Sequence, residues 1–559
     1  MSADTDVCIV GAGAGGVVAA WALARRGVRV LLLERGPRFT PSDYETHSPD
    51  WEVRPSPLDA FSDAPEQRSY ESPPGEPLDL HYRHLASRSP TTFAAPPPGR
   101  RRSFYYSRSL GVGGSTLHYQ AEAHRFPDHA FRMQSERGVA VDWPFEPREL
   151  APFYQRVEEL LQVAGDPVNP FKPPRGAYPH PAHPLSAASQ RLAAGAAKLG
   201  WRLLPNPLAI LPVARGSRAA CHYCNGCTRG CDVAAKSSVD VAVLPDAEAT
   251  GRLRVATRFQ ATRLEHAPDG RITAVVGFDA DGREERYEAR AFVLATGGVE
   301  TPRLLLASAG GAHPDGVGNA RDQVGRHFME TLFVQRMGYF EEPLDTWAGV
   351  PIEGRIWDWN GAAKRDDFPA GFVLGQFVGI LEGPAGNALD GIEGFGRRHR
   401  EAMRRRFGAG TTLLGIAEQL PRAENRVSLS HETDARGVPL ARVETRLDSL
   451  DLETLSRMHT RLGELAEAAG IRDLVGQSTA YDTPTATHVG GSCRMGRDAG
   501  SSVVDAFGAV HGVPNLVIAD ASVLVTQGAG DSPSLTIQAL ALRAAEALAD
   551  RARRGEVSR

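Results

Sequence analysis

Three stretches of the chain show the hydrophobic pattern of a short buried strand that runs into a glycine turn and then a helix. In the first, "VCIVGAGAGGVVAAWALARRGVRVLLLER" (7–35), β-branched apolar residues precede the turn, an amphipathic pattern follows it, and a second apolar strand ends at Glu34. This order of elements predicts a complete βαβ unit. Such a unit with a glycine-rich first turn is typical of dinucleotide binding.

The other two stretches lie far from the first in the sequence. "RAFVLATGGVETPRLLLAS" (290–308) predicts a buried strand from Phe292 to Ala295, followed by a glycine turn and a helix. "VPNLVIADASVLVT" (513–526) predicts a buried strand that ends at Asp520, with a helix from about Ser534 to Arg554 after it. We therefore expect three distant segments to build one nucleotide site.

The first βαβ unit assigns a separate task to each of its key residues. Gly11 permits the tight turn, Gly13 lets the backbone approach a pyrophosphate at the helix N-terminus, and Gly16 permits close packing of helix on strand. Glu34 follows the second strand and is placed to accept hydrogen bonds from ribose hydroxyls. The unit alone does not distinguish NAD from FAD.

Composition and charge narrow the class of protein. With 559 residues, of which 42% are hydrophobic and 23% charged, the chain can bury a large core. Its 63 basic and 67 acidic residues are mixed along the sequence and give a net charge of −4. No basic stretch of the kind that binds the phosphates of nucleic acid stands out, so we expect no nucleic-acid partner. The first residues show no secretory signal and no stretch is apolar enough to span a membrane, so we expect a cytoplasmic protein.

Two further segments stand out by composition. Residues 41–99 belong to a proline-rich stretch with little periodicity, which predicts a lid or an interaction segment. The other segment, "CHYCNGCTRGC", holds four of the six cysteines: Cys221, Cys224, Cys227 and Cys231. The spacing resembles that of ferredoxin ligands and also suits zinc, but Asp follows the last cysteine where ferredoxins have Pro. An iron-sulfur cluster, a zinc site and reduced or paired cysteines all stay open.

Several motifs, taken in order, resemble one family. "SRSLGVGGSTLHY" (107–119), "GGVETPRLLLAS" (297–308) and the segment 488–543, with "HVGGSCRMG" and "SPSLTIQALALR", are similar to the glucose-methanol-choline (GMC) flavoprotein oxidoreductases over nearly the whole chain. "STLHYQAEAHRF" and "VDWPFEPRELAPFYQRVEELLQVAG" resemble most the bacterial gluconate- and glucose-dehydrogenase branch. The resemblance implies an α/β plus α+β fold, with an FAD-binding Rossmann-like domain on a parallel sheet and a substrate domain on an antiparallel sheet.

The resemblance also implies how these two domains divide the chain and which residues contact FAD. The FAD-binding domain would be discontinuous and would comprise residues 1–40, 100–140, 216–325 and 485–559. The substrate-binding domain would comprise residues 141–215 and 326–484. Gly11, Gly13, Gly16 and Glu34 would bind the ADP half. Gly113, Gly114 and Ser115 would pass near the pyrophosphate and flavin, and Asp520 and Ala521 would lie along the ribityl chain. Tyr119 departs from the family, many members of which have Asn there.

Oxidation of an alcohol by hydride transfer to flavin needs a base for the hydroxyl proton and a dry pocket. The resemblance places His488 at the catalytic histidine and Ser532 at the second active-site position, where Asn or His is usual. A serine hydroxyl is a poor proton acceptor, so His488 would be the sole base. Asp531 and Ser532 are equally well explained as caps of the following helix. For Glu418, an exposed strand-end acid is favoured over a pocket carboxylate.

The predicted function is that of an FAD-dependent enzyme that oxidises a CH–OH group of an alcohol or sugar. The same fold used for lyase chemistry, or as a flavin electron-transfer subunit, is the alternative. The sequence leaves open the substrate, and also whether oxygen, a quinone or a redox partner takes the electrons.

Overall fold

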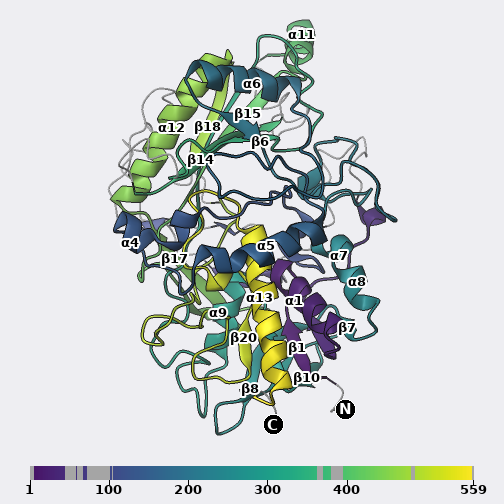
Figure 1. The fold of residues 1–559 in the computed structure, drawn as a ribbon, viewed down its shortest axis with the longest axis vertical. Helices are drawn as coiled ribbons and strands as arrows, with labels where there is room; N and C mark the ends of the chain where they lie inside the picture. Colours follow the sequence, from purple (N-terminus) through teal and green to yellow (C-terminus); the bar gives the residue numbers. More distant parts are fainter. Residues whose placement is uncertain are drawn as a thin grey trace.

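The computed structural model describes most of the chain as two large sheets with helices packed on them. The residues that it describes are 5–44, 58, 67–71, 101–102, 105–106, 108–361, 369–378, 394–479 and 485–556. In Figure 1 the parallel sheet and both chain termini lie in the lower half, and the large antiparallel sheet lies in the upper half.

The first sheet is parallel and has the strand order β20-β11-β1-β2-β7. Its strands are β1 (Val7–Val10), β2 (Val30–Leu33), β7 (Leu253–Ala256), β11 (Ala291–Leu294) and β20 (Leu516–Ile518). Every residue of β1, β2 and β11 is buried, as expected for strands that are covered on both faces. The three sequence segments that predicted buried strands therefore meet in one sheet.

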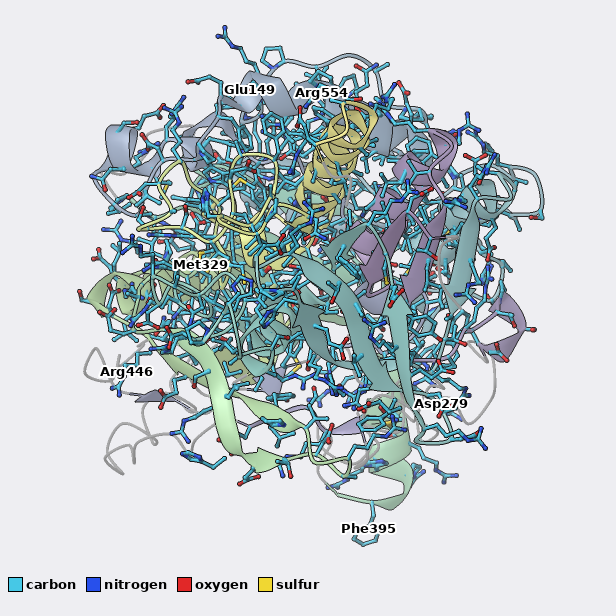
Figure 2. The ribbon with its side chains drawn as sticks, turned by 90° about the horizontal axis from the view of Figure 1, so that it is seen from below. Glu149, Asp279, Met329, Phe395, Arg446 and Arg554 are labelled. Atoms are coloured by element: carbon cyan, nitrogen blue, oxygen red, sulfur yellow. The ribbon has the colours of Figure 1, made fainter. Side chains whose placement is uncertain are left out.

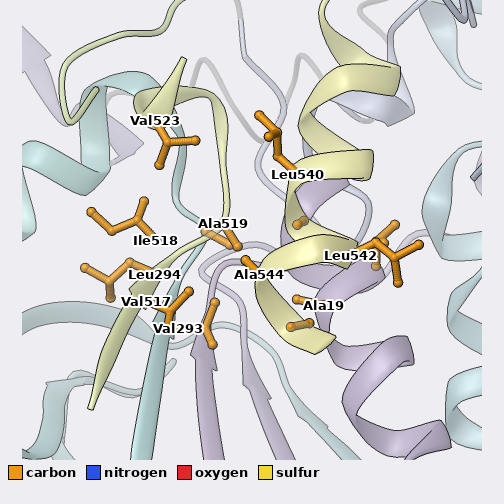
Figure 3. Packing of buried hydrophobic residues seen from close by; sticks show 14 of the residues in the cluster. Ala19, Val293, Leu294, Val517, Ile518, Ala519, Val523, Leu540, Leu542 and Ala544 are labelled. Carbon is orange, nitrogen blue, oxygen red and sulfur yellow. The ribbon is translucent and has the colours of Figure 1, made fainter. Parts of the chain in front are cut away.

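Helices α1 (Ala14–Arg25) and α13 (Ser534–Arg553) pack on this parallel sheet and on each other. Helix α5 (Pro147–Leu161) packs on α13, and α9 (Gly297–Ala307) follows β11. Helix α13 contacts α1, α5 and β20. Figure 3 shows apolar side chains of this contact, with Ala519 of the segment after β20 beside Ala544 of α13. This packing fixes the N-terminus of α13, where Ser532 lies, relative to the sheet.

The second large sheet is antiparallel and has the strand order β18-β12-β15-β14-β13-β6. Its strands are β6 (Leu203–Pro205), β12 (Thr331–Tyr339), β13 (Gly354–Ile356), β14 (Phe372–Val378), β15 (Gly410–Glu418) and β18 (Arg472–Thr479). Helices α6 (Ala187–Lys198) and α12 (Ser449–Ala469) contact each other and strands of this sheet, and enclose a second apolar core.

Smaller sheets and short helices complete the described part. The remaining strands are β3 (Tyr70–Glu71), β4 (Arg101–Arg102), β5 (Tyr105–Tyr106), β8 (Gln260–His266), β9 (Ile272–Phe278), β10 (Glu284–Glu288), β16 (Arg426–Thr433), β17 (Pro439–Arg446) and β19 (Thr485–Ala486). The short helices are α4 (Met133–Arg137), α7 (Val239–Ala242), α8 (Leu244–Glu248) and α11 (Gly396–Arg406). Figure 2 shows Phe395, which precedes α11, pointing away from the body of the molecule.

The predicted fold class is confirmed, because a parallel sheet with a βαβ unit and a separate antiparallel sheet are both present. The exact domain boundaries stay a prediction. Most of the proline-rich segment 41–99 lies outside the described residues, but its strand β3 pairs with β17. Within the described part of the chain, no helix has the length and apolar character that crossing a membrane requires.

Candidate functional site

One cavity of about 1590 Å³ is lined by residues of both large sheets and of the loops between them. Most of the residues predicted for the cofactor and for catalysis contribute to its wall: Gly11, Gly13, Glu34, Gly114, Ser115, His488, Asp520, Ala521 and Ser532. Gly16 and Gly113 do not line the cavity; Gly16 packs against Gly11, and Gly113 is hydrogen-bonded to Ala12. The structure thus brings together residues that are more than 500 positions apart in the sequence.

The first glycine turn has the close contacts that its sequence predicts. Gly11 has a φ of +100°, and a Cβ on Gly16 would lie 1.9 Å from the carbonyl oxygen of Gly11, so a larger residue does not fit there. A Cβ on Gly13 would have the Cα of Gly114 as its nearest neighbour, 3.9 Å away. The space in front of Gly13 is therefore open and belongs to the cavity.

The N-terminus of α1 faces this open space. Ala14 and Gly15, its first two residues, line the cavity, and no side chain among the described residues caps the helix. Backbone N–H groups at an uncapped helix N-terminus carry a partial positive charge and bind phosphate groups. The open space beside Gly13, together with the N–H groups at the start of α1, fits the diphosphate of a dinucleotide.

A second glycine turn packs directly against the first. Gly113 donates its N–H to the carbonyl of Ala12 at 2.8 Å, and a Cβ on Gly114 would lie 2.7 Å from the Cα of Gly13. Gly114 also has a φ of +53°, in the left-handed region. The contact therefore requires glycine at position 114, whereas a Cβ at position 13 would point into the cavity.

Glu34 holds the first turn in place. Its carboxylate accepts a hydrogen bond from the N–H of Ala12 at 2.9 Å and another from the N–H of Gly36 at 2.8 Å. Burial raises its pKa above the ordinary value. Each carboxylate oxygen keeps one further acceptor position for a ligand at the cavity wall. Its predicted contact with ribose stays a prediction.

Asp520 joins the middle and C-terminal segments of the site. Its two carboxylate oxygens accept four hydrogen bonds, from the N–H of Gly297 (2.9 Å), the hydroxyl of Thr301 (2.6 Å), and the N–H (2.8 Å) and hydroxyl (2.6 Å) of Ser522. Four bonds occupy the acceptor positions of a carboxylate. Asp520 is thus engaged in shaping the wall, and a contact of its side chain with the ribityl chain is a prediction that these bonds do not favour.

His488 lies half-buried on the wall between the two sheets. Its backbone N–H donates to the hydroxyl of Thr331 at 3.3 Å, and its carbonyl accepts from the side chain of Gln527 at 2.5 Å. Within the described part of the chain, no hydrogen bond to the imidazole ring is seen. Burial lowers the pKa of His488 to about 4, so the ring is neutral near pH 7 and has a nitrogen that can accept a proton.

Glu122 is a site residue that the sequence reasoning missed. It lines the cavity, and its carboxylate accepts two hydrogen bonds from Arg355 (2.8 and 3.0 Å), one from Asn206 (2.8 Å) and one from the hydroxyl of Ser532 (2.7 Å). Although burial acts in the opposite direction, the charge of Arg355 holds the pKa of Glu122 below its usual range. A signal was present: the spacing E-x-H in "AEAHRF" places Glu122 and His124 on the same side of an extended segment.

The interpretation of Asp531 and Ser532 as helix caps is wrong. The N-cap of α13 is Pro533, and no described side chain caps that helix. Asp531 is buried and instead forms an ion pair with Lys172 and accepts the indole N–H of Trp357 at 3.0 Å. The hydroxyl of Ser532 is directed to Glu122, so this short segment belongs to a buried polar network.

The expectation that Glu418 is an exposed strand-end acid is also wrong. Glu418 ends β15 with 2% of its surface exposed, and its carboxylate accepts the N–H of Gln527 at 2.6 Å. Burial raises its pKa to about 7. It lies behind the cavity wall, so the alternative of a pocket carboxylate is not supported either. Glu418 is buried because β15 contacts the loop before α13, and the pattern of the strand alone could not predict this contact.

The cysteine loop borders the cavity without forming a metal site in the described residues. Cys221, Cys224, Cys227 and Cys231 are all free thiols, and in the described ranges no three potential ligands are grouped to hold a metal ion. The buried ammonium of Lys236 donates to the carbonyls of Cys227 (2.6 Å), Leu117 (2.7 Å) and Tyr119 (3.2 Å). These bonds tie the loop to the second glycine turn, and neither the cluster nor the zinc interpretation gains support. Tyr119, the departure from the family, donates its hydroxyl to the carbonyl of Ser237 at 2.7 Å.

The part of the wall that comes from the antiparallel sheet is mainly apolar and aromatic. It includes side chains of β12, β14 and β15, of the loop between β12 and β13, and of the residue that follows α11: Phe333, Phe377, Leu414, Ile416, Trp347 and Phe407. Thr331 and Gln335 add polar groups. An apolar wall with a few polar groups excludes water and orients a small substrate. No residue pattern in the sequence identified this wall.

Comparisons with known proteins agree with the site. The family models described as GMC oxidoreductase match residues 6–330 and 421–541. The chain is 29% identical to the fructose dehydrogenase large subunit of Gluconobacter japonicus, over 99% of both chains. It is 29% identical to 2-methyl-1,2-propanediol dehydrogenase of Mycolicibacterium austroafricanum, over 98% of this chain and 96% of that protein. It is 30% identical to 6'''-hydroxyparomomycin C oxidase of Streptomyces lividus, over 97% of this chain and 91% of that protein.

Solved structures show the same fold at lower sequence identity. Pyridoxine 4-oxidase from Mesorbium loti superposes with a TM-score of 0.62 at 18% identity, covering 97% of this chain and 99% of that one. A formate oxidase superposes with a TM-score of 0.62 at 15% identity, covering 100% of both chains. A variant of the formate oxidase of Aspergillus oryzae RIB40, studied for its FAD modification, superposes with a TM-score of 0.61 at 17% identity, covering 100% of both chains.

Proposed function

The chain belongs to the GMC oxidoreductase family, and we propose on this basis that it is an FAD-dependent enzyme that oxidises a CH–OH group of a small alcohol or sugar. The observation that carries the proposal is one cavity that is lined both by the dinucleotide turn and by a neutral His488. The names of the similar proteins support the substrate class, since they include a sugar, a diol and a hydroxylated aminoglycoside.

The residues at the dinucleotide end fit FAD. Gly13 and the N–H groups that begin α1 would hold the diphosphate, and Glu34 would accept hydrogen bonds from the adenosine ribose. Ser115 and Ala521 also line the cavity and would border the flavin side of the cofactor. When bound, FAD supplies the acceptor for the two electrons that leave the alcohol carbon.

The chain's own residues bind the alcohol and remove its proton. The neutral imidazole of His488 accepts the hydroxyl proton, which Ser532 cannot do because a serine hydroxyl is a weak base. The aromatic wall formed by Phe333 and Phe377 keeps water away from the reacting carbon. A positioned general base of this kind contributes about 10²- to 10⁴-fold to a rate.

A substrate panel tests the proposal. Sugars, diols and simple alcohols are supplied anaerobically with a dye as electron acceptor, and the series is then repeated with oxygen. We expect dye reduction with at least one of these alcohols, and the second series identifies whether oxygen serves as acceptor. Turnover should fall by about 10²- to 10⁴-fold in His488→Ala. It should be retained in His511→Ala, because His511 bonds to Ser502 outside the cavity wall. Bound flavin with no turnover of any alcohol would instead favour lyase chemistry or an electron-transfer role.

A further inference from the structure

Ser532 lines the cavity with its hydroxyl proton already engaged. Its Oγ donates to Glu122 Oε2 at 2.7 Å, and Glu122 is held ionised by two hydrogen bonds from Arg355. A hydroxyl has one proton to donate and two lone pairs to accept with. Toward the cavity, Ser532 therefore presents acceptor positions and no donor.

Glu122 itself cannot take a substrate hydroxyl. Oε1 accepts from Arg355 Nε (2.8 Å) and from Asn206 (2.8 Å), while Oε2 accepts from Arg355 Nη2 (3.0 Å) and from Ser532 (2.7 Å). These four bonds fill the four acceptor positions of a carboxylate. Glu122 is thus a positioning residue, and its effect on a substrate passes through Ser532.

The backbone of Ser532 is fixed by the same network. Its N–H donates to His124 Nδ1 at 3.0 Å, so the proton of the neutral His124 ring is on Nε2, which donates to Asn206 Oδ1 at 2.6 Å. Asn206 then donates its amide N–H to Glu122. The bonds close a ring from the amide of Ser532 back to its hydroxyl. A closed ring of hydrogen bonds holds the serine in one rotamer.

This arrangement divides the work at the substrate end. The proton of the reacting hydroxyl goes to His488, since one proton cannot be given to two acceptors and imidazole is the stronger base. Ser532 cannot donate to a developing alkoxide, because its proton is bonded to Glu122. At the cavity wall, the hydroxyl oxygen of Ser532 can therefore only accept a hydrogen bond, from a second donor group of the substrate. A buried acceptor left without a partner disfavours any ligand that lacks this donor.

We propose that the substrate of this enzyme is a diol or polyol, or an amino alcohol, whose second O–H or N–H donor is accepted by Ser532 Oγ while the first hydroxyl is oxidised. The proposal rests on the proposed function and narrows it. A simple monohydric alcohol, or an ether at the second position, leaves the Ser532 acceptor empty.

Matched substrates test this directly on the FAD-loaded, full-length protein. Propane-1,2-diol is compared with 2-methoxypropan-1-ol and 1-methoxypropan-2-ol, each of which keeps one hydroxyl and the second oxygen but lacks the second donor. We expect the wild-type kcat/KM for flavin reduction to be about tenfold higher for the diol than for either ether, the range expected for one hydrogen bond. In Ser532→Ala this ratio should fall to about one.

Two further variants separate positioning from structure. Glu122→Gln should also lower the ratio of diol to ether, because a neutral partner no longer fixes the serine proton. Ser430→Ala removes a buried serine hydroxyl that accepts a backbone N–H outside the cavity, and should keep the wild-type ratio. Partial unfolding of a variant would lower the diol and ether rates equally and would leave their ratio unchanged. The comparison of the diol with the ethers in the wild-type protein depends on no variant.

The outcomes are distinct. Equal rates for the diol and both ethers in the wild-type protein would overturn the inference and leave the proposed function standing. A fall of diol and ether rates by the same factor in Ser532→Ala would also overturn it, because Ser532 would then act on the reacting hydroxyl. If no alcohol, diol or ether reduces the flavin, the proposed function fails and the inference fails with it.

Discussion

Replacing Gly13 by valine should separate folding from cofactor binding. The backbone at Gly13 has φ −82° and ψ −165°, which valine adopts readily, and an added Cβ would come no closer than 3.9 Å to its nearest neighbour, the Cα of Gly114. The unliganded variant should therefore keep its free energy of unfolding, or gain about 0.4–1 kcal/mol from the smaller entropy of the unfolded chain. The new side chain projects into the space that the diphosphate needs.

The loss of FAD affinity follows from the groups that valine would screen. If two hydrogen bonds from the N-terminus of α1 to the charged diphosphate are lost, at about 1.5–3 kcal/mol each, binding weakens by about 3–6 kcal/mol. This corresponds to a rise of about 10²- to 10⁴-fold in Kd. The affinity is measured by titrating the unliganded protein with FAD and following flavin fluorescence, and the stability by urea unfolding.

Gly176→Val is the matched control, because Gly176 is exposed and no heavy atom of the described residues lies within 4 Å of its added Cβ. It should bind FAD as the wild-type protein does. Wild-type FAD affinity in Gly13→Val would refute the assignment of this turn to the diphosphate. A large loss of stability in the unliganded variant would show that the space in front of Gly13 is filled by the protein itself.

Further predictions concern the buried charged groups. His488→Ala should lower the rate of flavin reduction by about 10²- to 10⁴-fold with FAD still bound. In a pH-rate profile of the wild-type protein, kcat/KM should fall only as the pH drops through about 4, where the imidazole of His488 gains a proton. Glu122→Gln should cost about 3–5 kcal/mol in urea unfolding because Arg355 is left buried without its partner, and Glu122→Gln combined with Arg355→Met should recover part of that loss. Burial raises the pKa of Glu418 to about 7 in the folded protein, so the protonated side chain stabilises the fold at low pH. As the pH rises from about 4.5 to 7, the free energy of unfolding should decrease by up to about 3 kcal/mol. Glu418→Gln should lack this pH dependence when unfolding is measured over the same range.

The sequence predicted the dinucleotide half of the molecule because its constraints are local. Gly11 and Gly114 have positive φ angles, a Cβ on Gly16 would lie 1.9 Å from the carbonyl oxygen of nearby Gly11, and the apolar strands of the parallel sheet are buried on both faces. Such constraints leave a pattern in a single stretch of sequence. The expected end of the last helix at Arg554 differs from the observed end at Arg553 by one residue, which is the usual uncertainty of a helix terminus.

The substrate half was not readable, since its contacts join residues that no local pattern relates. Glu122 meets Arg355 and Ser532 only after two sheets are assembled, and nothing in the sequence around each of them indicates the others. The same holds for Glu418, whose burial depends on the loop at Gln527. Ser532 read equally well as a helix cap because a serine before a helix has that local meaning. The network to which it belongs decides against the cap.

The most direct test of the proposed function is the anaerobic mixing of the FAD-loaded protein with an excess of an alcohol or sugar, followed at the visible absorption band of the flavin. The proposed function predicts one FAD per chain, bleaching of the flavin band, and one equivalent of carbonyl product for each flavin that is reduced. A flavin band that stays unchanged with every diol, sugar and simple alcohol, in a protein that holds FAD at full occupancy, would contradict it.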